Sequence, residues 1–204
     1  MIKNFIFDLG NVIVDFNPQD MTRKYVSDEI NLKKVSEAAF SRKIFDKLDS
    51  GEFTDEDGRN YIKNTVDRSI LEQTLLTYDN WMDNLKPIEG IKELIEDIKS
   101  RGYKIYLLSN VTGGFKQKYS EIEAVYDILK NFDGLVISGE IKMVKPNLEI
   151  YEYILKRFDL KAQECIFIDD KKENTDAAIK CNMSAYTFKT DVKELKKYIK
   201  KEIY

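Results

Sequence analysis

Hydrophobic positions along the chain follow two different periods. Between residues 17 and 86 they recur at helical spacing, and no stretch is convincing as a strand. Thr54 is followed three residues later by Asp57, which resembles a capping box at the start of a helix. Helices are expected in this part of the chain at residues 21–30, 32–48, 54–66 and 70–85. The segment is therefore predicted to be a small helical insert.

From Pro87 to the end, short apolar runs alternate with helical stretches. Strands are expected at residues 104–108, 135–137, 165–168 and 185–188, and helices at 88–98, 115–129, 147–158, 175–181 and 193–204. This alternation is typical of a parallel sheet that is covered by helices and built from right-handed crossovers. We therefore expect an α/β fold, with a Rossmann-like core formed by residues 1–16 and 87–204 and interrupted by a helical bundle at residues 17–86.

The first strand carries a charge at its end. Residues 5–9 are apolar apart from Asp8, as expected for a strand buried on both faces. A buried carboxylate costs several kcal/mol unless it is paired, and Gly10 allows a sharp turn two residues later. Asp8 is thus expected at the carboxyl end of a central strand, where open α/β sheets place their sites. From this stretch alone, Asp8 is equally explained as the cap of a turn or helix.

The composition of the chain limits the kinds of binding partner and cellular location that are expected. The 204 residues carry a net charge of −3, and only the lysine-rich tail is basic, which argues against nucleic acid or an anionic membrane as a partner. No apolar run approaches the length of a membrane span, and the first residues lack a signal-peptide pattern. The two cysteines, Cys165 and Cys181, lie in apolar or helical contexts. A reduced, cytoplasmic protein is expected.

Histidine is absent from the sequence. Its absence excludes Ser-His-Asp and Cys-His mechanisms and histidine metal sites. Any chemistry must therefore use carboxylates, lysine, hydroxyl groups and hard metal ions.

Polar residues follow four of the expected strands, where a parallel sheet would bring them to one edge. Each has an ordinary explanation as a turn or helix cap or as a solvated side chain. Together they are harder to explain, because three carboxylates at one edge repel each other without a cation. Carboxylates and a backbone carbonyl suit Mg²⁺, and a lysine with a hydroxyl suits phosphate. The residues are Asp8 with Gly10, Ser109 with Asn110, Lys145, and Asp169 with Asp170.

These four segments resemble the motifs of the haloacid dehalogenase-like superfamily. They read FIFDLGNVI, LLSN, KP and IFIDD, in the order and spacing of that superfamily, across residues 1–16 and 87–190. The helical insert resembles the small alpha-helical cap domain of one subclass. As a set the motifs are specific, although each one alone is weak.

The resemblance implies a phosphoryl-transfer site. Asp8 would attack phosphorus and form an aspartyl-phosphate that water hydrolyses. The Asp8 side chain and the Gly10 carbonyl would hold Mg²⁺, together with Asp169 or Asp170. The Ser109 hydroxyl and the Asn110 backbone N–H would bind the substrate's phosphate oxygens, and Lys145 would neutralise phosphate charge and orient Asp8.

One position departs from the superfamily pattern. Its phosphatases usually carry a second Asp two residues after the nucleophile, as the acid that protonates the leaving group, and here that position is Gly10. Asp15 is a candidate replacement. The form DLGNV resembles a subgroup that includes sugar-1-phosphate phosphatases such as alpha-D-glucose-1-phosphate phosphatase, whose leaving group needs the acid less.

The expected function is a Mg²⁺-dependent phosphatase of a small phosphorylated metabolite, of which a sugar phosphate is one candidate. Two alternatives stay open. The first is a metal-independent 2-haloacid dehalogenase that uses the same Asp8, against which the acidic pair Asp169 and Asp170 argues. The second is a catalytically weak protein that binds a phosphate ligand.

Overall fold

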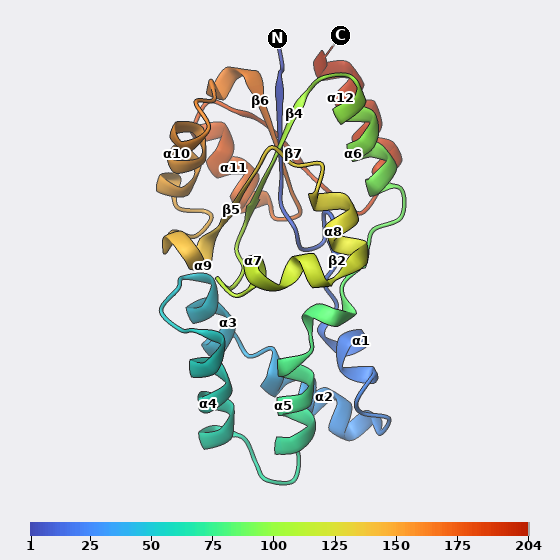
Figure 1. The fold of residues 1–204 in the computed structure, drawn as a ribbon, viewed down its shortest axis with the longest axis vertical. Helices are drawn as coiled ribbons and strands as arrows, with labels where there is room; N and C mark the ends of the chain where they lie inside the picture. Colours follow the sequence, from blue (N-terminus) through green and yellow to red (C-terminus); the bar gives the residue numbers. More distant parts are fainter. Residues whose placement is uncertain (204) are drawn as a thin grey trace.

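A five-stranded parallel sheet forms the centre of the larger region in the computed structural model, which describes residues 1–203 (Figure 1). Its order is β5-β4-β1-β6-β7, so that the first strand of the chain is the central one. The strands are β1 (Asn4–Phe7), β4 (Lys104–Ser109), β5 (Gly134–Ile137), β6 (Cys165–Asp169) and β7 (Ser184–Thr187). The expected α/β class is confirmed. The last residue of the expected tail helix, Tyr204, lies outside the described residues.

Helices cover both faces of the sheet (Figure 1). Successive residues of β1 point to opposite faces, so that Phe5 and Phe7 join one apolar cluster and Ile6 joins the other. Both clusters exclude water, which is why the strand is a continuous apolar run. The helices of the sheet region are α6 (Ile91–Ser100), α7 (Phe115–Lys118), α8 (Glu123–Leu129), α9 (Ser138–Ile141), α10 (Leu148–Arg157), α11 (Lys172–Lys180) and α12 (Val192–Ile203), with 3-10 turns at Tyr119–Glu121 and Ala162–Glu164.

The helix expected at residues 115–129 is interrupted. Helix α7 passes into the 3-10 turn and the chain bends at Ile122 before α8 begins. Phe115 before the bend and Val125 after it are both fully buried in the same apolar cluster.

The helical insert is built from α1 (Pro18–Arg23), α2 (Glu29–Ala39), α3 (Arg42–Asp49), α4 (Asp55–Thr65), α5 (Leu71–Asp79) and a 3-10 turn (Met82–Asn84). The capping box is confirmed: the Asp57 carboxylate accepts from the Thr54 N–H at 2.9 Å, and the Thr54 hydroxyl accepts from the Asp57 N–H at 3.2 Å.

Three expected helices of the insert are wrong in extent. The helix expected at 70–85 ends at Asp79, and a separate 3-10 turn follows at Met82–Asn84. Helix α1 ends at Arg23 rather than continuing to residue 30, and the helix expected at 32–48 is two helices that meet at Phe40 and Ser41. Phe40 and Phe45 would lie on nearly opposite sides of one straight helix. The break brings their ring centroids to 5.4 Å, so that tertiary packing sets this helix end.

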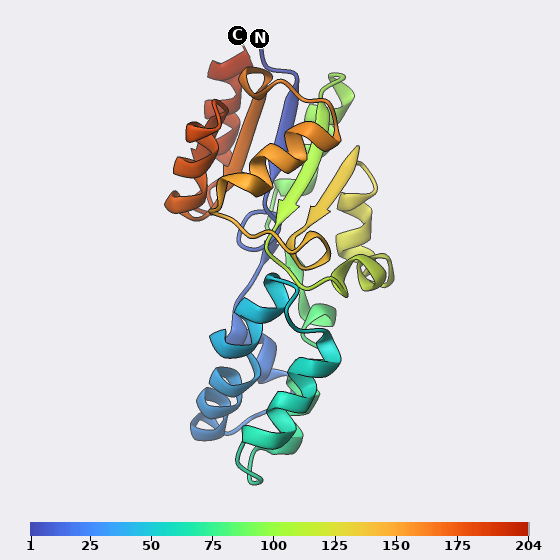
Figure 2. The ribbon, with the colours of Figure 1, turned by 90° about the vertical axis from the view of Figure 1, so that its left-hand side faces the viewer.

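The insert is joined to the sheet region by two strands that pair with each other. Strand β2 (Val14–Asp15) runs antiparallel to β3 (Lys86–Pro87), with Val14 opposite Pro87. The sequence predicted no strand here, because two residues are too few to show a period. Figure 2 shows the two linking segments side by side between the two regions.

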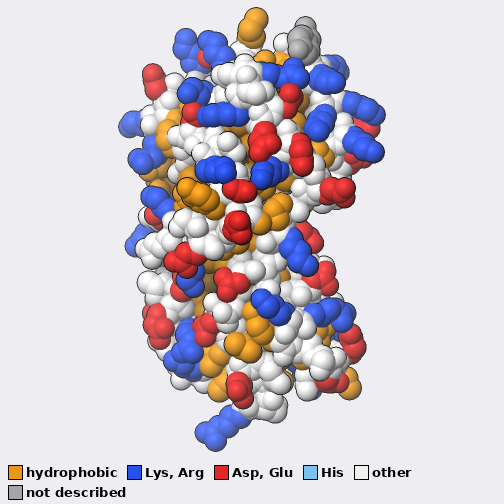
Figure 3. Space-filling view, turned by 45° about the vertical axis from the view of Figure 1, so that its right-hand side comes forward, with side chains coloured by type: hydrophobic (Ala, Val, Ile, Leu, Met, Phe, Trp, Pro, Cys, Tyr) orange, Lys and Arg blue, Asp and Glu red, His pale blue; other side chains and the backbone are white. Residues whose placement is uncertain are grey.

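On the face shown in Figure 3, acidic and basic side chains are interspersed over both regions, and hydrophobic side chains are visible near the junction. Among the helices of residues 1–203, none combines the length and the apolar character that crossing a bilayer requires.

Candidate active site

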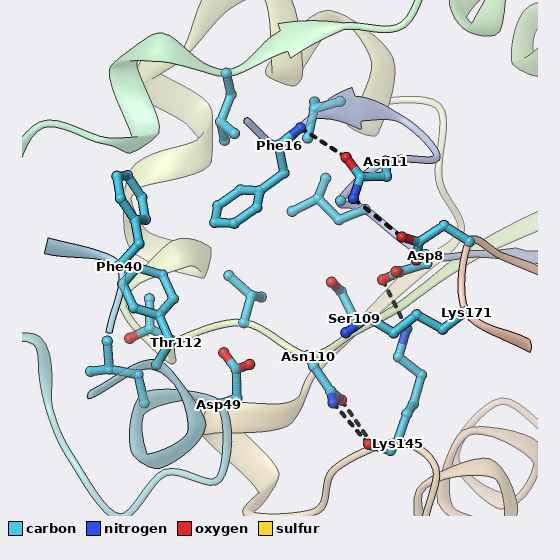
Figure 4. A pocket seen from close by; sticks show the side chains of 18 of the residues that line it. Asp8, Asn11, Phe16, Phe40, Asp49, Ser109, Asn110, Thr112, Lys145 and Lys171 are labelled. Carbon is cyan, nitrogen blue, oxygen red and sulfur yellow. Dashed lines mark hydrogen bonds and ion pairs between the residues drawn. The ribbon is translucent and has the colours of Figure 1, made fainter. Parts of the chain in front are cut away.

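A cavity of about 310 Å³ lies between the carboxyl edge of the sheet and the helical insert (Figure 4). The sheet region contributes six of the predicted site residues to its lining: Asp8, Gly10, Ser109, Asn110, Lys145 and Asp170. The seventh, Asp169, lies directly behind Lys145 and is fully buried. The structure therefore brings together all of the strand-end residues that the sequence singled out.

Lys145 links two carboxylates at the base of the cavity. Its ammonium lies 2.8 Å from Asp8 Oδ1 and 2.7 Å from Asp169 Oδ2, and its side chain is 1% exposed. Burial alone would lower the pKa of Lys145, but Asp8 and Asp169 together hold that pKa above its usual value. Lys145 is therefore a stable cation shared by two anions.

Asp8 follows β1 directly, and its backbone N–H donates to the Ile168 carbonyl at 2.9 Å. Burial raises the pKa of Asp8 to about 6; Lys145 opposes this rise and the negative charge of Asp169 adds to it. The Asp8 side chain is 11% exposed, toward the cavity. The Asp8 carboxylate is therefore held in place by the end of a strand and by an ion pair.

Asp169 is held by donors on several sides. The Lys171 N–H donates to its Oδ1 at 2.9 Å, and the Asn174 amide donates to both carboxylate oxygens at 2.9 and 3.0 Å. No sequence motif pointed to Asn174 as part of this site. Its only signal is its place in the first turn of α11, five residues after Asp169.

Asn110 positions Lys145 through its side chain. The amide oxygen accepts from the Lys145 N–H at 2.9 Å, and the amide nitrogen donates to the Lys145 carbonyl at 3.0 Å. The Asn110 side chain is therefore engaged with the backbone of Lys145 through both its amide oxygen and its amide nitrogen. Ser109 ends β4, and its hydroxyl points into the cavity (Figure 4).

Three carboxylates form a group that suits a hard cation. Asp8, Asp169 and Asp170 each place an oxygen within 4.8 Å of the others. Asn11 orients Asp170 by donating to its Oδ2 at 3.2 Å, and its own amide oxygen accepts from the Phe16 N–H. The single charge of Lys145 does not balance three anions, and every donor is an oxygen. This donor set fits Mg²⁺.

Gly10 turns the chain without a left-handed conformation. The positive φ of this loop lies at Asn11, at 57°. A Cβ built on Gly10 would lie 3.8 Å from Phe16 Cβ, an ordinary van der Waals contact. The backbone therefore accepts a side chain at this position.

Asp49 is a cavity residue that the sequence did not predict. It is the last residue of α3, one position beyond the helix expected to end at residue 48, and no motif marks it. Burial raises the pKa of Asp49 to about 7, while the positive charge of Lys171 opposes the rise. Asp15, a candidate replacement for the missing acid, is exposed on β2 and does not line the cavity.

Comparison with known proteins places the chain among hydrolases. Residues 2–182 match the haloacid dehalogenase-like hydrolase family. A sesquiterpene phosphatase from Aspergillus oryzae is 28% identical over 176 residues, which are 86% of this chain and 84% of that protein. A D-ribitol-5-phosphate phosphatase from Bacteroides thetaiotaomicron is 26% identical over 187 residues, 85% of each chain.

Solved structures agree with the fold. A crystal structure of a family enzyme from Bacteroides thetaiotaomicron, in complex with magnesium and inorganic phosphate, superimposes with a TM-score of 0.71. The match covers 93% of this chain and 96% of that chain, at 24% identity. At this level of identity the likeness extends to the fold.

Proposed function

The chain belongs to the haloacid dehalogenase-like hydrolase family and is a phosphoric monoester hydrolase, and we propose that it removes phosphate from a small metabolite through an aspartyl-phosphate formed on Asp8. The observation that carries this proposal is the buried arrangement of Asp8, Lys145 and Asp169 beside Asp170 at one edge of the sheet. A cavity of about 310 Å³ is at the lower end of the range for ligand pockets, which suits a small substrate.

In the proposed reaction, an Asp8 oxygen forms a bond to phosphorus as the bond to the leaving oxygen breaks. Lys145 holds the other Asp8 oxygen in place and neutralises phosphate charge. The Ser109 hydroxyl and the Asn110 backbone bind the substrate's phosphate oxygens. Water then hydrolyses the aspartyl-phosphate and frees Asp8. Most of the rate enhancement comes from positioning and charge neutralisation.

The Asp8 carboxylate, the Gly10 carbonyl and the carboxylates of Asp169 and Asp170 would hold Mg²⁺. Bound there, the ion supplies positive charge to the transferring phosphate. The remaining parts of the proposal concern substrate and location. A sugar phosphate is one candidate substrate, no nucleic acid or membrane partner is expected, and the free thiols of Cys165 and Cys181 are in keeping with a cytoplasmic location.

Two alternatives use the same fold. A 2-haloacid dehalogenase would use Asp8 without metal, and a phosphate-binding protein would bind without turnover. The three-carboxylate group disfavours the dehalogenase, because such a group is difficult to keep ionised without a cation.

The test is hydrolysis of an aryl phosphate by protein treated with EDTA and then supplied with Mg²⁺. Activity should disappear with the chelator and return with the ion. Undiminished activity in EDTA contradicts the metal-dependent mechanism, and release of halide from 2-chloropropionate under those conditions supports the dehalogenase. Tight binding of phosphate analogues without turnover supports the binding protein.

A further inference from the structure

The wall of the cavity opposite Asp8 is aromatic. Phe16, Phe40, Phe45 and Trp81 line it, and each ring contacts others of the group, with Phe16 centroids 5.8 Å from Phe40 and 5.8 Å from Trp81. Val14, Leu48, Leu85 and Val111 extend the apolar lining. We call Phe16, Phe40, Phe45 and Trp81 the aromatic wall.

The aromatic wall is not simply the interior of the insert. Trp81 is 6% exposed, but the three phenylalanines are only half-buried, and Figure 4 shows Phe16 and Phe40 directed into the open space. They come from three segments: the chain after β2, the turn between α2 and α3, and α3 itself. Apolar surface that faces water is unfavourable by roughly 25 cal/mol per Å², so a ligand that covers these rings gains affinity.

Polar groups are scarce on this side of the cavity. Among the described residues of the insert that line it, only Arg42 and Asp49 have charged side chains, and the one further polar group is the indole N–H of Trp81. A polyhydroxylated leaving group would need a partner for each hydroxyl, because a buried hydroxyl without one is strongly disfavoured. The wall therefore suits a leaving group with few hydroxyls.

Resting on the proposed phosphatase activity, we propose that the leaving group is a compact apolar alcohol, so that the substrate is an alkyl or aryl phosphate monoester rather than a sugar phosphate. The phosphate lies at Asp8 and Lys145, and the hydrocarbon part lies against the aromatic wall. The cavity volume limits this part to a small group.

The test is a series of n-alkyl phosphates, from ethyl to hexyl, measured beside ribose 5-phosphate and glucose 1-phosphate. The value of kcat/KM should rise about fourfold for each added methylene until the cavity is full, and the sugar phosphates should lie below butyl phosphate. If the sugar phosphates are hydrolysed faster than every alkyl phosphate, this inference is wrong, but the proposed phosphatase activity still stands. If no ester is hydrolysed, the proposed function itself fails.

A matched pair of variants assigns the selectivity to the aromatic wall. Phe45→Ala should lower kcat/KM for hexyl phosphate much more than for ethyl phosphate. Phe53→Ala is the control, because Phe53 packs on Tyr61 within the insert and does not line the cavity. Circular dichroism confirms that both variants are folded. An equal loss for ethyl and hexyl phosphate in Phe45→Ala contradicts the proposal.

A second inference rests on a different observation, an unpaired carboxylate in the cavity. Of the three carboxylates among the described lining residues, Asp8 and Asp170 belong to the metal-binding group and Asp49 does not. No hydrogen bond or ion pair of Asp49 is found within residues 1–203, and Figure 4 shows its carboxylate directed into the cavity. The charged groups that face it are Arg42 and Asp46 on α3, and Lys171 and Asp8 at the sheet edge.

From this placement, and resting on the proposed phosphatase activity, we infer that Asp49 is the proton donor to the leaving group and replaces the acid missing at Gly10. As the bond between phosphorus and the leaving oxygen breaks, the Asp49 carboxyl gives its proton to that oxygen. The resulting carboxylate accepts a proton from the water that hydrolyses the aspartyl-phosphate, which restores the starting state. The raised pKa of Asp49, about 7, allows both steps near neutral pH.

The test uses Asp49→Asn with two substrates. An alkyl phosphate has a basic leaving group and should be hydrolysed about 10²–10⁴-fold more slowly, whereas 4-nitrophenyl phosphate should lose little, because nitrophenolate leaves without a proton. Glu52→Gln, an exposed change just beyond the same helix at a residue that does not line the cavity, is the control and should affect neither substrate. Equal losses for the two substrates in Asp49→Asn, or no loss for either, overturn the assignment.

Two further readouts separate proton transfer from a structural role. In the parent protein, alkyl phosphate hydrolysis should fall as pH rises above 7, and Asp49→Asn should lose this dependence. Introducing Gly10→Asp into the Asp49→Asn protein should restore part of the alkyl phosphatase activity, since the backbone at Gly10 accepts a side chain. A pH dependence unchanged in Asp49→Asn contradicts the inference.

Discussion

The sheet region and the helical insert present opposite kinds of surface to the same cavity. The sheet edge buries Lys145 at 4% and Asp169 at 0% exposure, held by mutual ion pairs and by the strand ends. The insert presents half-buried rings and one unpaired carboxylate, Asp49. The sheet region thus supplies fixed, paired charges to the cavity, whereas the insert supplies most of its apolar lining.

The interiors of the two regions differ in a corresponding way. The sheet lies between two large apolar clusters that share β1. The insert has two small clusters of its own, one around Ile62 and Tyr78 and one around Val35 and Ile70. Because apolar burial is the main stabilising term, the insert should be the less stable of the two regions. The predictions below test this division from the largest expected effect to the smallest.

Asp8→Asn should lower kcat by about 10⁴-fold or more for every phosphate ester, because the nucleophile is lost with little change in volume. The loss should be the same for sugar, alkyl and aryl phosphates, as expected if the sheet edge provides the chemistry. Steady-state kinetics with one substrate of each class is the measurement. Thermal unfolding should show that the fold is retained. A variant that keeps most of its activity removes Asp8 from the mechanism.

Ile62→Ala should destabilise the insert by about 2–5 kcal/mol, since it leaves a cavity where a fully buried side chain was. Hydrogen exchange should show lost protection in α4 and α5 and unchanged protection in β1 and β4. Lys63→Ala, an exposed neighbour on the same helix, is the control. If the amides of β1 lose protection equally, the two regions are one cooperative unit and the contrast drawn between them is wrong.

Thr112→Val removes a bond between the regions. The Thr112 hydroxyl donates to Asp55 Oδ1 at 2.8 Å, which links the loop after β4 to the start of α4. Its loss, worth about 0.5–1.5 kcal/mol, should raise KM by up to about tenfold, since the insert covers the cavity. Thr77→Val is a matched control, because the buried Thr77 hydroxyl has no partner. An unchanged KM would show that this bond does not hold the insert over the cavity.

The smallest effect concerns the sheet region at acid pH. Burial alone would raise the pKa of Asp133, but hydrogen bonds from Lys99, Lys104 and the Ile105 N–H hold that pKa below its usual value. A carboxylate with a lowered pKa stabilises the fold above the unfolded pKa, near 4, and this contribution is lost as pH falls through the folded pKa.

The free energy of unfolding of Asp133→Asn should therefore depend less on pH between pH 5 and 2 than that of the parent protein. The difference should be less than about 1 kcal/mol, because both lysines are partly exposed. Urea unfolding at several pH values is the measurement. A parallel shift at every pH would show that the carboxylate does not titrate as described.

The sheet region could be predicted from the sequence because its signals are local. Residues 5–9 form an apolar run interrupted only by Asp8, and this pattern predicts the central strand with a carboxylate at its end. The candidate site was predicted only when the polar residues after the other strands were added. Ser109 and Asp170 end or directly follow other strands, and parallel strands bring them to the same edge as Asp8. Lys145 lies in a loop after α9, and its place at this edge depends on the hydrogen bonds with the Asn110 side chain.

The insert was predicted less well because its contacts are distant in sequence. The break at Phe40 depends on rings from Phe16 and Trp81, and no local pattern records them. Asp49 is an ordinary helix-end residue until the insert is placed over Asp8. Helix periodicity gave the class of the insert, but only the tertiary arrangement gives its part in the cavity.

The pairing of β2 with β3 has a consequence for how this architecture can vary. The chain leaves the sheet region at Val14 and re-enters it at Pro87, directly opposite. With respect to the sheet, the whole insert is a loop whose two ends are adjacent. The entropy of closing such a loop changes only slowly with its length. The segment between β2 and β3 could therefore be replaced by helices of another length, or with other residues facing the cavity, without changing the register of any strand in the sheet.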